Sequence, residues 1–263
     1  MGGGVFAKTH EVQRLNNEEL ERVSSFITSK LEAAGIKSYA IKSIKEKSDH
    51  GDIDILVSTH DGILKLFDES LPNSLNADAL SILFEMKYQI DFIKVRSIDC
   101  WEISRLFYDF NDCGNLIGRL LNRNKFSFKP HGLYAVYRTP VRKYDIFLNN
   151  SIEDVLLLSG LDIERYNQGF DTYKDLFKFI ASSRYFGKSI YRYENMTNAQ
   201  RFRDKKRKTY TAFVEWMEQQ DLPEQQKEFD YRPEDYSNFN SEKETIDAEE
   251  HYDNVYRSAF NGH

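Results

Sequence analysis

The chain has 263 residues and a mass of 31.0 kDa, enough for one large domain or two small ones. Its two cysteines, Cys100 and Cys113, are too few for a disulfide framework or a zinc site, and no apolar run approaches the roughly 20 residues that span a bilayer. These features predict a protein of a reducing, cytoplasmic compartment with no membrane partner.

The net charge of −6 is unevenly distributed along the chain. Residues 224–263 carry a net charge of −7, and the preceding residues carry +1. The composition therefore does not exclude a nucleic-acid partner for the body of the protein. We expect residues 223–263 to form an acidic tail that either covers a basic surface or is disordered.

Hydrophobic periodicity and turn residues predict helices and strands in segregated order. The first helix starts at Asn16 or Asn17 and ends at Gly35. The elements expected after it are strands at 38–44 and 52–57, a helix at 62–69, strands at 80–86 and 88–95, a helix opened by a capping box of Asp99 and Glu102, a helix from Asn111 or Asp112 to Leu121, a hairpin of 132–138 and 142–148 around Thr139-Pro140, a helix from Ser151 to Leu158, and helices near 172–183 and 197–220. This order favours an α+β fold over a doubly wound one.

The segment from Gly51 to Val57 places two carboxylates on one face of an apolar strand. Side chains at i and i+2 of a strand point the same way, so Asp52 and Asp54 share a face. Two like charges on a half-buried strand repel each other and lose hydration, and a divalent cation with oxygen ligands relieves both effects. The segment therefore predicts a metal site that handles phosphates.

Asp91 is a third carboxylate with apolar neighbours, in the predicted strand 88–95. If this strand lies beside the Asp52/Asp54 strand, three carboxylates converge, as a two-metal phosphoryl-transfer site requires. The alternative is that Asp52 and Asp54 are solvated residues of an edge strand and that Asp91 pairs with a lysine such as Lys94. Adjacent strands and close carboxylates would distinguish the two.

The Gly-Asp-x-Asp strand with a later strand Asp resembles the DNA polymerase β superfamily of nucleotidyltransferases. In that family a Gly-Ser pair precedes the two aspartates by about ten residues and binds the triphosphate. Lys42-Ser43 stands in its place here, so the expected glycine is absent. The resemblance implies that Ser43, Lys42 and Gly51 contact the nucleotide.

A second match is to the nucleotide-selecting helix of the family-X polymerases. An aromatic pair, Phe107-Tyr108, precedes a turn and then Asn115 and Arg119, which share a helix face at i and i+4. The resemblance, which covers roughly residues 38–161, implies that Asn115 and Arg119 contact the nascent pair and that Tyr108 lies against the sugar. The alternative is an ordinary polar helix face.

A dense basic run follows on the last predicted helix. Such a run suits binding to a phosphate backbone, and the alternative is a solvated face balanced by the acidic tail. Its members are Arg201, Arg203, Lys205, Lys206, Arg207 and Lys208.

Together these features predict a Mg²⁺-dependent nucleotidyltransferase with two ions, Mn²⁺ being the alternative metal. Residues 1–98 would form a palm-like catalytic domain with Asp52, Asp54 and Asp91 as catalytic metal ligands, and residues 99–222 a nucleotide-binding and helical region. The enzyme would transfer a nucleoside monophosphate from an NTP or dNTP to a nucleic-acid 3′-OH. The alternatives are a minimal nucleotidyltransferase that modifies a protein, a tRNA or a small molecule, a non-catalytic nucleotide- or nucleic-acid-binding module, and a structural or interaction protein.

Overall fold

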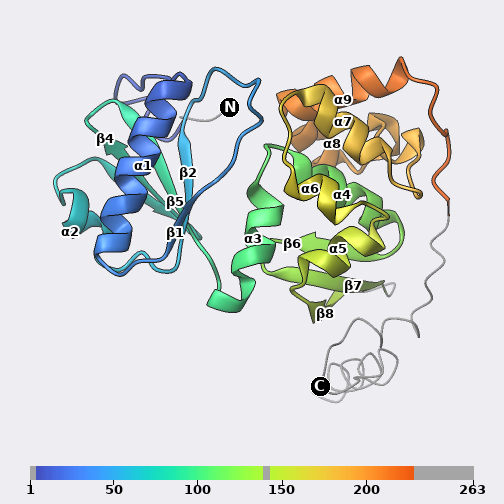
Figure 1. The fold of residues 1–263 in the computed structure, drawn as a ribbon, viewed down its shortest axis with the longest axis horizontal. Coiled ribbons are helices and arrows are strands. Elements are labelled where there is room, and N and C mark those ends of the chain that lie inside the picture. The colour runs from blue at the N-terminus through green and yellow to red at the C-terminus, as the bar shows by residue number, and fades with distance from the viewer. Residues whose placement is uncertain (1–3, 139–142, 228–263) are drawn as a thin grey trace.

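The computed structural model describes residues 4–138 and 143–227, which form two lobes lying side by side (Figure 1). The first lobe holds α1 (Asn17–Ala33), β1 (Ser38–Ala40), β2 (Ile53–Val57), α2 (Ile63–Phe67), β3 (Asn73–Asn76), β4 (Ala79–Phe84) and β5 (Tyr88–Lys94). The second lobe holds α3 (Trp101–Tyr108), α4 (Cys113–Arg123), β6 (Phe126–Lys129), β7 (Gly132–Arg138), β8 (Lys143–Asn149), α5 (Ile152–Leu158), α6 (Ile163–Asn167), α7 (Tyr173–Ala181), α8 (Asn198–Asp204) and α9 (Lys208–Glu218). The fold is α+β, as predicted.

The first lobe is built on a mixed five-stranded sheet in the order β1-β2-β5-β4-β3. Strands β2 and β5 are parallel neighbours, and every other pair is antiparallel. The prediction that the Asp91 strand lies beside the Asp52/Asp54 strand is therefore confirmed.

Helix α1 covers one face of this sheet. Asn16 and Glu19 form a capping box at its start, and Gly35 takes a left-handed φ of 75° just after its end. Val23, Ile27 and Leu31 are buried along its inner stripe. This packing leaves the other face of the sheet turned toward the second lobe.

Strand β2 contributes to two hydrophobic cores. Ile53, Ile55 and Val57 pack in the core beneath α1, whereas Leu56 belongs to the larger core of the second lobe. Leu56 follows Asp52 and Asp54 at strand spacing, so the aspartate face of β2 is the face that meets the second lobe.

Several predicted elements differ from the observed ones. The polar edge strand β3 and the short elements β6 and α6 were not predicted. Ile98–Cys100 forms a 3₁₀ turn, and α3 begins at Trp101 without a side-chain cap, so the capping box expected for Asp99 and Glu102 is wrong. The hairpin β7–β8 is confirmed, but its Thr139-Pro140 turn lies outside the described residues.

The predicted helix across residues 197–220 is two helices. Helix α8 ends at Asp204 and α9 starts at Lys208, so the basic run spans a turn rather than one helix face. The reason is a buried ion-pair network at Asp204, which is described below.

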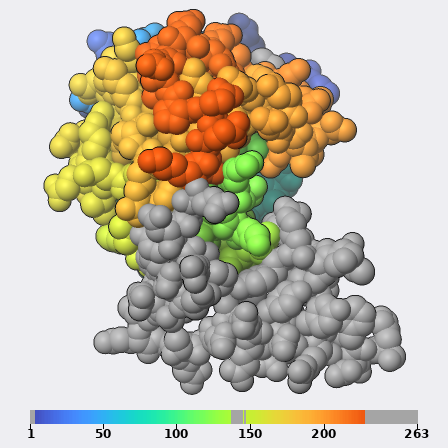
Figure 2. Space-filling view, turned by 90° about the vertical axis from the view of Figure 1, so that its right-hand side faces the viewer, coloured from blue at the N-terminus to red at the C-terminus, as the bar shows by residue number. Residues whose placement is uncertain are grey.

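The described part of the predicted tail packs against the second lobe. The amides of Lys188 and Ser189 donate to the carbonyls of Pro223 and Glu224, and Gln226 donates to Leu120. Figure 2 shows this last described segment in orange-red, beside the green of α4. Residues 228–263 lie outside the described residues, and within the described ones no helix is long and apolar enough to cross a membrane.

Candidate functional site

Three aspartates meet on the face of the sheet that is turned toward the second lobe. Asp54 on β2 and Asp91 on β5 are directly paired across the parallel ladder, and Asp52 immediately precedes β2. One carboxylate oxygen of each lies within 4.8 Å of those of the other two. These are the spacing and the oxygen ligands that a divalent cation requires.

The electrostatics of the three carboxylates are unfavourable without a cation. Burial and the charges of Asp52 and Asp91 raise the pKa of Asp54 to about 8. Burial likewise raises the pKa of Asp91, and the charge of Asp52 adds to the effect. Carboxylates with pKa values raised in this way bind a proton unless a positive charge replaces it, so the residues present fit a divalent ion.

Two polar side chains that sequence reasoning missed support Asp91. The Gln89 amide nitrogen donates to both Asp91 oxygens at 3.0 Å, and its oxygen accepts from the backbone N–H of Val5 at 3.0 Å. Ser81, opposite Asp91 on β4, donates to it as well. Gln89 lies two residues from Asp91 on the same face, which was the available signal in the sequence.

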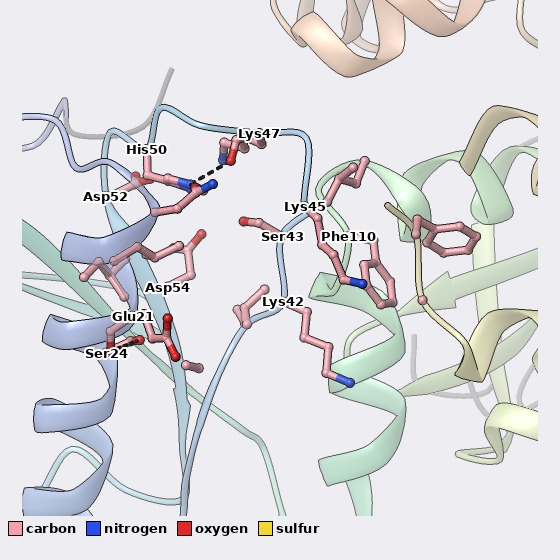
Figure 3. Close-up of a pocket in the computed structure, with 18 of the residues that line it drawn as sticks. Glu21, Ser24, Lys42, Ser43, Lys45, Lys47, His50, Asp52, Asp54 and Phe110 are labelled. Atoms are coloured by element: carbon pink, nitrogen blue, oxygen red, sulfur yellow. Dashed lines mark hydrogen bonds between the residues drawn. The ribbon is translucent and has the colours of Figure 1, made fainter. Parts of the chain in front are cut away.

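Asp52 and Asp54 lie at the boundary of two adjoining cavities of about 600 and 660 Å³. Both cavities are lined by Lys47, Asp52 and Asp54. The first extends along α1 and the segment 40–45, and part of it is shown in Figure 3. The second extends toward the second lobe, whose residues Lys206, Arg207 and Lys208 line it. From the first lobe, Gly51 and Arg14 also line this cavity. The carboxylates of one lobe thus face cations of the other.

The predicted phosphate-contacting residues lie differently around the first cavity. Ser43 directs its hydroxyl into the cavity, toward the side on which Asp52 and Asp54 lie, whereas the Lys42 side chain extends away from them (Figure 3). His50, in the same loop, is buried and bonds to Asn17 at 2.9 Å and to the Lys47 carbonyl at 3.1 Å. His50 therefore fixes the loop through these hydrogen bonds.

The segment that carries Lys42 and Ser43 is held by the second lobe. The buried Asp109 carboxylate accepts from the Lys42 amide and from the Tyr39 hydroxyl, each at 2.8 Å. The Phe110 amide donates to the Lys42 carbonyl at 2.7 Å, although Phe110 and Asn111 both have φ near +60°. This conformation is uncommon for a bulky residue such as phenylalanine, whereas asparagine adopts it more readily. Long-range hydrogen bonds from the second lobe therefore fix the position of this segment.

The proposed nucleotide-contacting helix lines a third cavity of about 320 Å³, which shares Asn111 and Arg207 with the second. Asn115 and Arg119 both line it, as their helical spacing predicted, and so does Tyr108. The Asn115 amide nitrogen is buried and has no hydrogen-bond partner among the described residues. Burial and the charge of Asp54 raise the pKa of Tyr108 to about 12, which keeps its hydroxyl protonated.

The guanidinium of Arg119, which was expected to contact the nucleotide, is already engaged within the protein. It forms a buried ion pair with Asp204, which is fully buried. Asp204 also accepts from Arg203 at 2.9 Å and lies 3.8 Å from Arg207, whose other partner is Asp112. This network attaches the turn between α8 and α9 to α4.

The basic run is consequently divided between structural and exposed residues. The three arginines all have partners within the protein. Arg201 donates to the carbonyls of Tyr193 and Met196, and Arg203 and Arg207 form the ion pairs described above. Lys205, Lys206 and Lys208 are exposed, and within residues 4–138 and 143–227 no acidic group lies within 4.0 Å of their ammonium nitrogens. The lysines are therefore the cations of this run that remain available to a phosphate.

Comparison of the sequence with protein-family models finds no match, and comparison with curated proteins finds none either. What the site can do chemically is therefore inferred from the geometry described above. Three close carboxylates can hold divalent cations, and the lysines across the cavity can bind an anionic ligand.

Proposed function

We propose that this protein is a two-metal nucleotidyltransferase of the polymerase β type. The observation that carries the proposal is the in-register pairing of Asp54 and Asp91 with Asp52 beside them. The order helix, strand, Asp-x-Asp strand and later Asp strand also agrees with the resemblance drawn from the sequence. Lysines on the opposite side of the cavity offer charge complementary to a triphosphate.

Asp52 and Asp54 would hold both ions, and Asp91 would hold the ion nearer the acceptor. Mg²⁺ bound there would lower the pKa of an attacking hydroxyl and neutralise charge on the triphosphate. The acceptor oxygen forms a bond to the α-phosphorus, the bond between that phosphorus and the bridging oxygen breaks, and pyrophosphate leaves. The hydroxyl proton would pass to Asp91, which would hold the ion nearer the acceptor.

We take a nucleic-acid 3′ end as the acceptor. The cavity with the carboxylates continues to a turn with three exposed lysines, and a polyanion is the acceptor that such a turn favours. The third cavity, with Tyr108 and the unpaired Asn115 amide, adjoins the second and would take the sugar and base of the nucleotide.

The test is nucleotide incorporation by the purified full-length chain. Labelled NTPs or dNTPs are supplied with Mg²⁺ or Mn²⁺ and a primer, with and without a template strand, and pyrophosphate release is measured in parallel. We expect a longer primer with the wild type, a loss of at least about 100-fold in Asp54→Asn, and no change in Asp61→Asn, an exposed control outside the cavity. Pyrophosphate release undiminished in Asp54→Asn would refute the proposal, and label on protein instead of primer would refute the nucleic-acid acceptor.

A further inference from the structure

An exposed aromatic ring lies beside the free lysines at the corner between α8 and α9. We define this α8–α9 corner as Phe202, Lys205 and Lys206. The Phe202 side chain is 67% exposed, and the Lys206 ammonium lies 3.6 Å from the centre of its ring. Lys205 lies in the same turn, over the Tyr193 ring.

Phe202 differs from the other exposed phenylalanines of the described residues. Phe26 is 50% exposed but packs on Phe84, and Phe147 is 53% exposed but packs on Tyr134. Among the described residues, no aromatic ring packs against Phe202. Within the described part of the chain, the Phe202 ring is contacted by the Lys206 ammonium, which a ligand can displace without opening a core.

The corner is held in place by ion pairs to the buried Asp204 carboxylate. Asp204 is at its centre, and the bonds from Arg119 and Arg203 attach it to α4 and α8. Helix α4 is in turn part of the core of the second lobe. A fixed turn presents its exposed groups at a constant position, so binding there does not require the turn to be ordered.

The corner adjoins the carboxylate cavity. Lys206 lines the cavity that also contains Asp52 and Asp54, and Phe202 is in contact with Lys206. A flexible polyanion whose end reaches the carboxylates would therefore pass the Phe202 ring. An aromatic face is available on that path, and so are lysines that have no acidic partner among the described residues.

We infer that the α8–α9 corner binds the single-stranded end of the acceptor nucleic acid. A base stacks on the Phe202 ring in place of the Lys206 ammonium, and Lys205 and Lys206 bind the phosphates on either side. Stacking needs an unpaired base, whereas the lysines alone would also bind a duplex, so the ring selects single strands. This inference rests on the proposed function, because the 3′ end is placed at the carboxylates.

The experiment measures binding of a fluorescein-labelled single strand of roughly ten nucleotides, as DNA and as RNA, by anisotropy. The full-length chain is used without divalent metal or nucleotide. We expect Phe202→Ala to weaken single-strand binding at least about fivefold, Phe202→Trp to retain it, and duplex binding to change by less than about twofold. Phe26→Ala is the matched control and leaves binding unchanged.

Unchanged single-strand affinity in Phe202→Ala, with the fold verified by circular dichroism, would overturn the inference. So would an equal loss for single strand and duplex. Nucleotide-incorporation assays distinguish failure of the inference about the α8–α9 corner from failure of the proposed function. If the wild type incorporates nucleotides but Phe202→Ala binds and extends primers normally, only the corner is refuted. If no nucleotide is incorporated but strand binding depends on Phe202, the corner stands and the transfer reaction is refuted.

Discussion

At the scale of single residues, Asp54 should make the metal-free protein less stable than an uncharged variant. The pKa of Asp54 is raised to about 8 by burial and by its acidic neighbours. Between the ordinary carboxyl pKa and about 8, the folded state binds more protons than the unfolded state, so stability falls as the pH rises. We expect Asp54→Asn to be more stable than the wild type by at least about 1 kcal/mol near pH 8, and by less near pH 5.

Urea denaturation in EDTA at both pH values measures this difference. Asp61→Asn, which removes an exposed carboxylate, is the control and should follow the wild type. If Asp54→Asn is less stable than the wild type near pH 8, the pKa of Asp54 is not raised in the folded protein. Adding Mn²⁺ should stabilise the wild type and leave Asp54→Asn unaffected.

Gln89 should control the affinity for metal through Asp91. Its amide nitrogen donates to both Asp91 oxygens, and the Val5 amide fixes its orientation. Gln89→Leu removes both of these hydrogen bonds to Asp91. Their loss lets the pKa of Asp91 rise further and leaves the Asp91 side chain less well fixed. We expect about 10–100-fold weaker Mn²⁺ binding, measured by calorimetry. Affinity equal to that of the wild type would show that Ser81 alone positions the carboxylate.

At the scale of elements, the attachment of β1 and the following segment to the second lobe should depend on Asp109. Asp109→Ala leaves the Lys42 amide and the Tyr39 hydroxyl without their acceptor. We expect a loss of roughly 2 kcal/mol or more in the free energy of unfolding, measured in urea. Asp109→Asn keeps an acceptor for the Lys42 amide and should lose less. Equal losses in the two variants would show that the carboxylate charge, rather than the acceptor geometry, fixes the segment.

The elements that the sequence predicted are those whose signals are local. The alternation in Gly51–Val57 predicted β2 and the shared face of its aspartates, and the Asn16 cap and Gly35 predicted the ends of α1. Strand β3 was missed because Asn73–Asn76 is polar and lies at the sheet edge, where neither face supplies a hydrophobic pattern.

The contacts that the sequence did not show are long-range. The break between α8 and α9 depends on Arg119, which lies 85 residues before Asp204, and residues 205–207 are all good helix formers. The Asp109 bonds cross 67 and 70 residues to Lys42 and Tyr39. The parallel pairing of β2 and β5 could be proposed only as a condition, because strand order is a tertiary property.

At the scale of the whole molecule, both lobes contribute charged groups to one cavity. The first lobe supplies Asp52, Asp54 and Lys47, and the second supplies Lys206 and Lys208. The segment held by Asp109 connects the lobes beside the adjoining first cavity, which also contains Asp52 and Asp54. We therefore expect a ligand with both metal-binding and anionic groups to contact both lobes, and a metal ion alone to contact only the first.

Lys208→Ala should separate these two kinds of binding. The exposed Lys208 ammonium faces the cavity that contains Asp52 and Asp54, so its loss should weaken binding of a nucleoside triphosphate about three- to tenfold. Mn²⁺ binding in the absence of nucleotide should not change, because the aspartates are untouched. The triphosphate effect should shrink as salt is raised, since an exposed charge is screened. Calorimetry with a non-hydrolysable triphosphate measures both affinities, and Lys174→Ala, an exposed lysine on α7 outside the cavity, is the control. Equal losses in the two lysine variants would mean that net charge, and not the position of Lys208, determines the affinity.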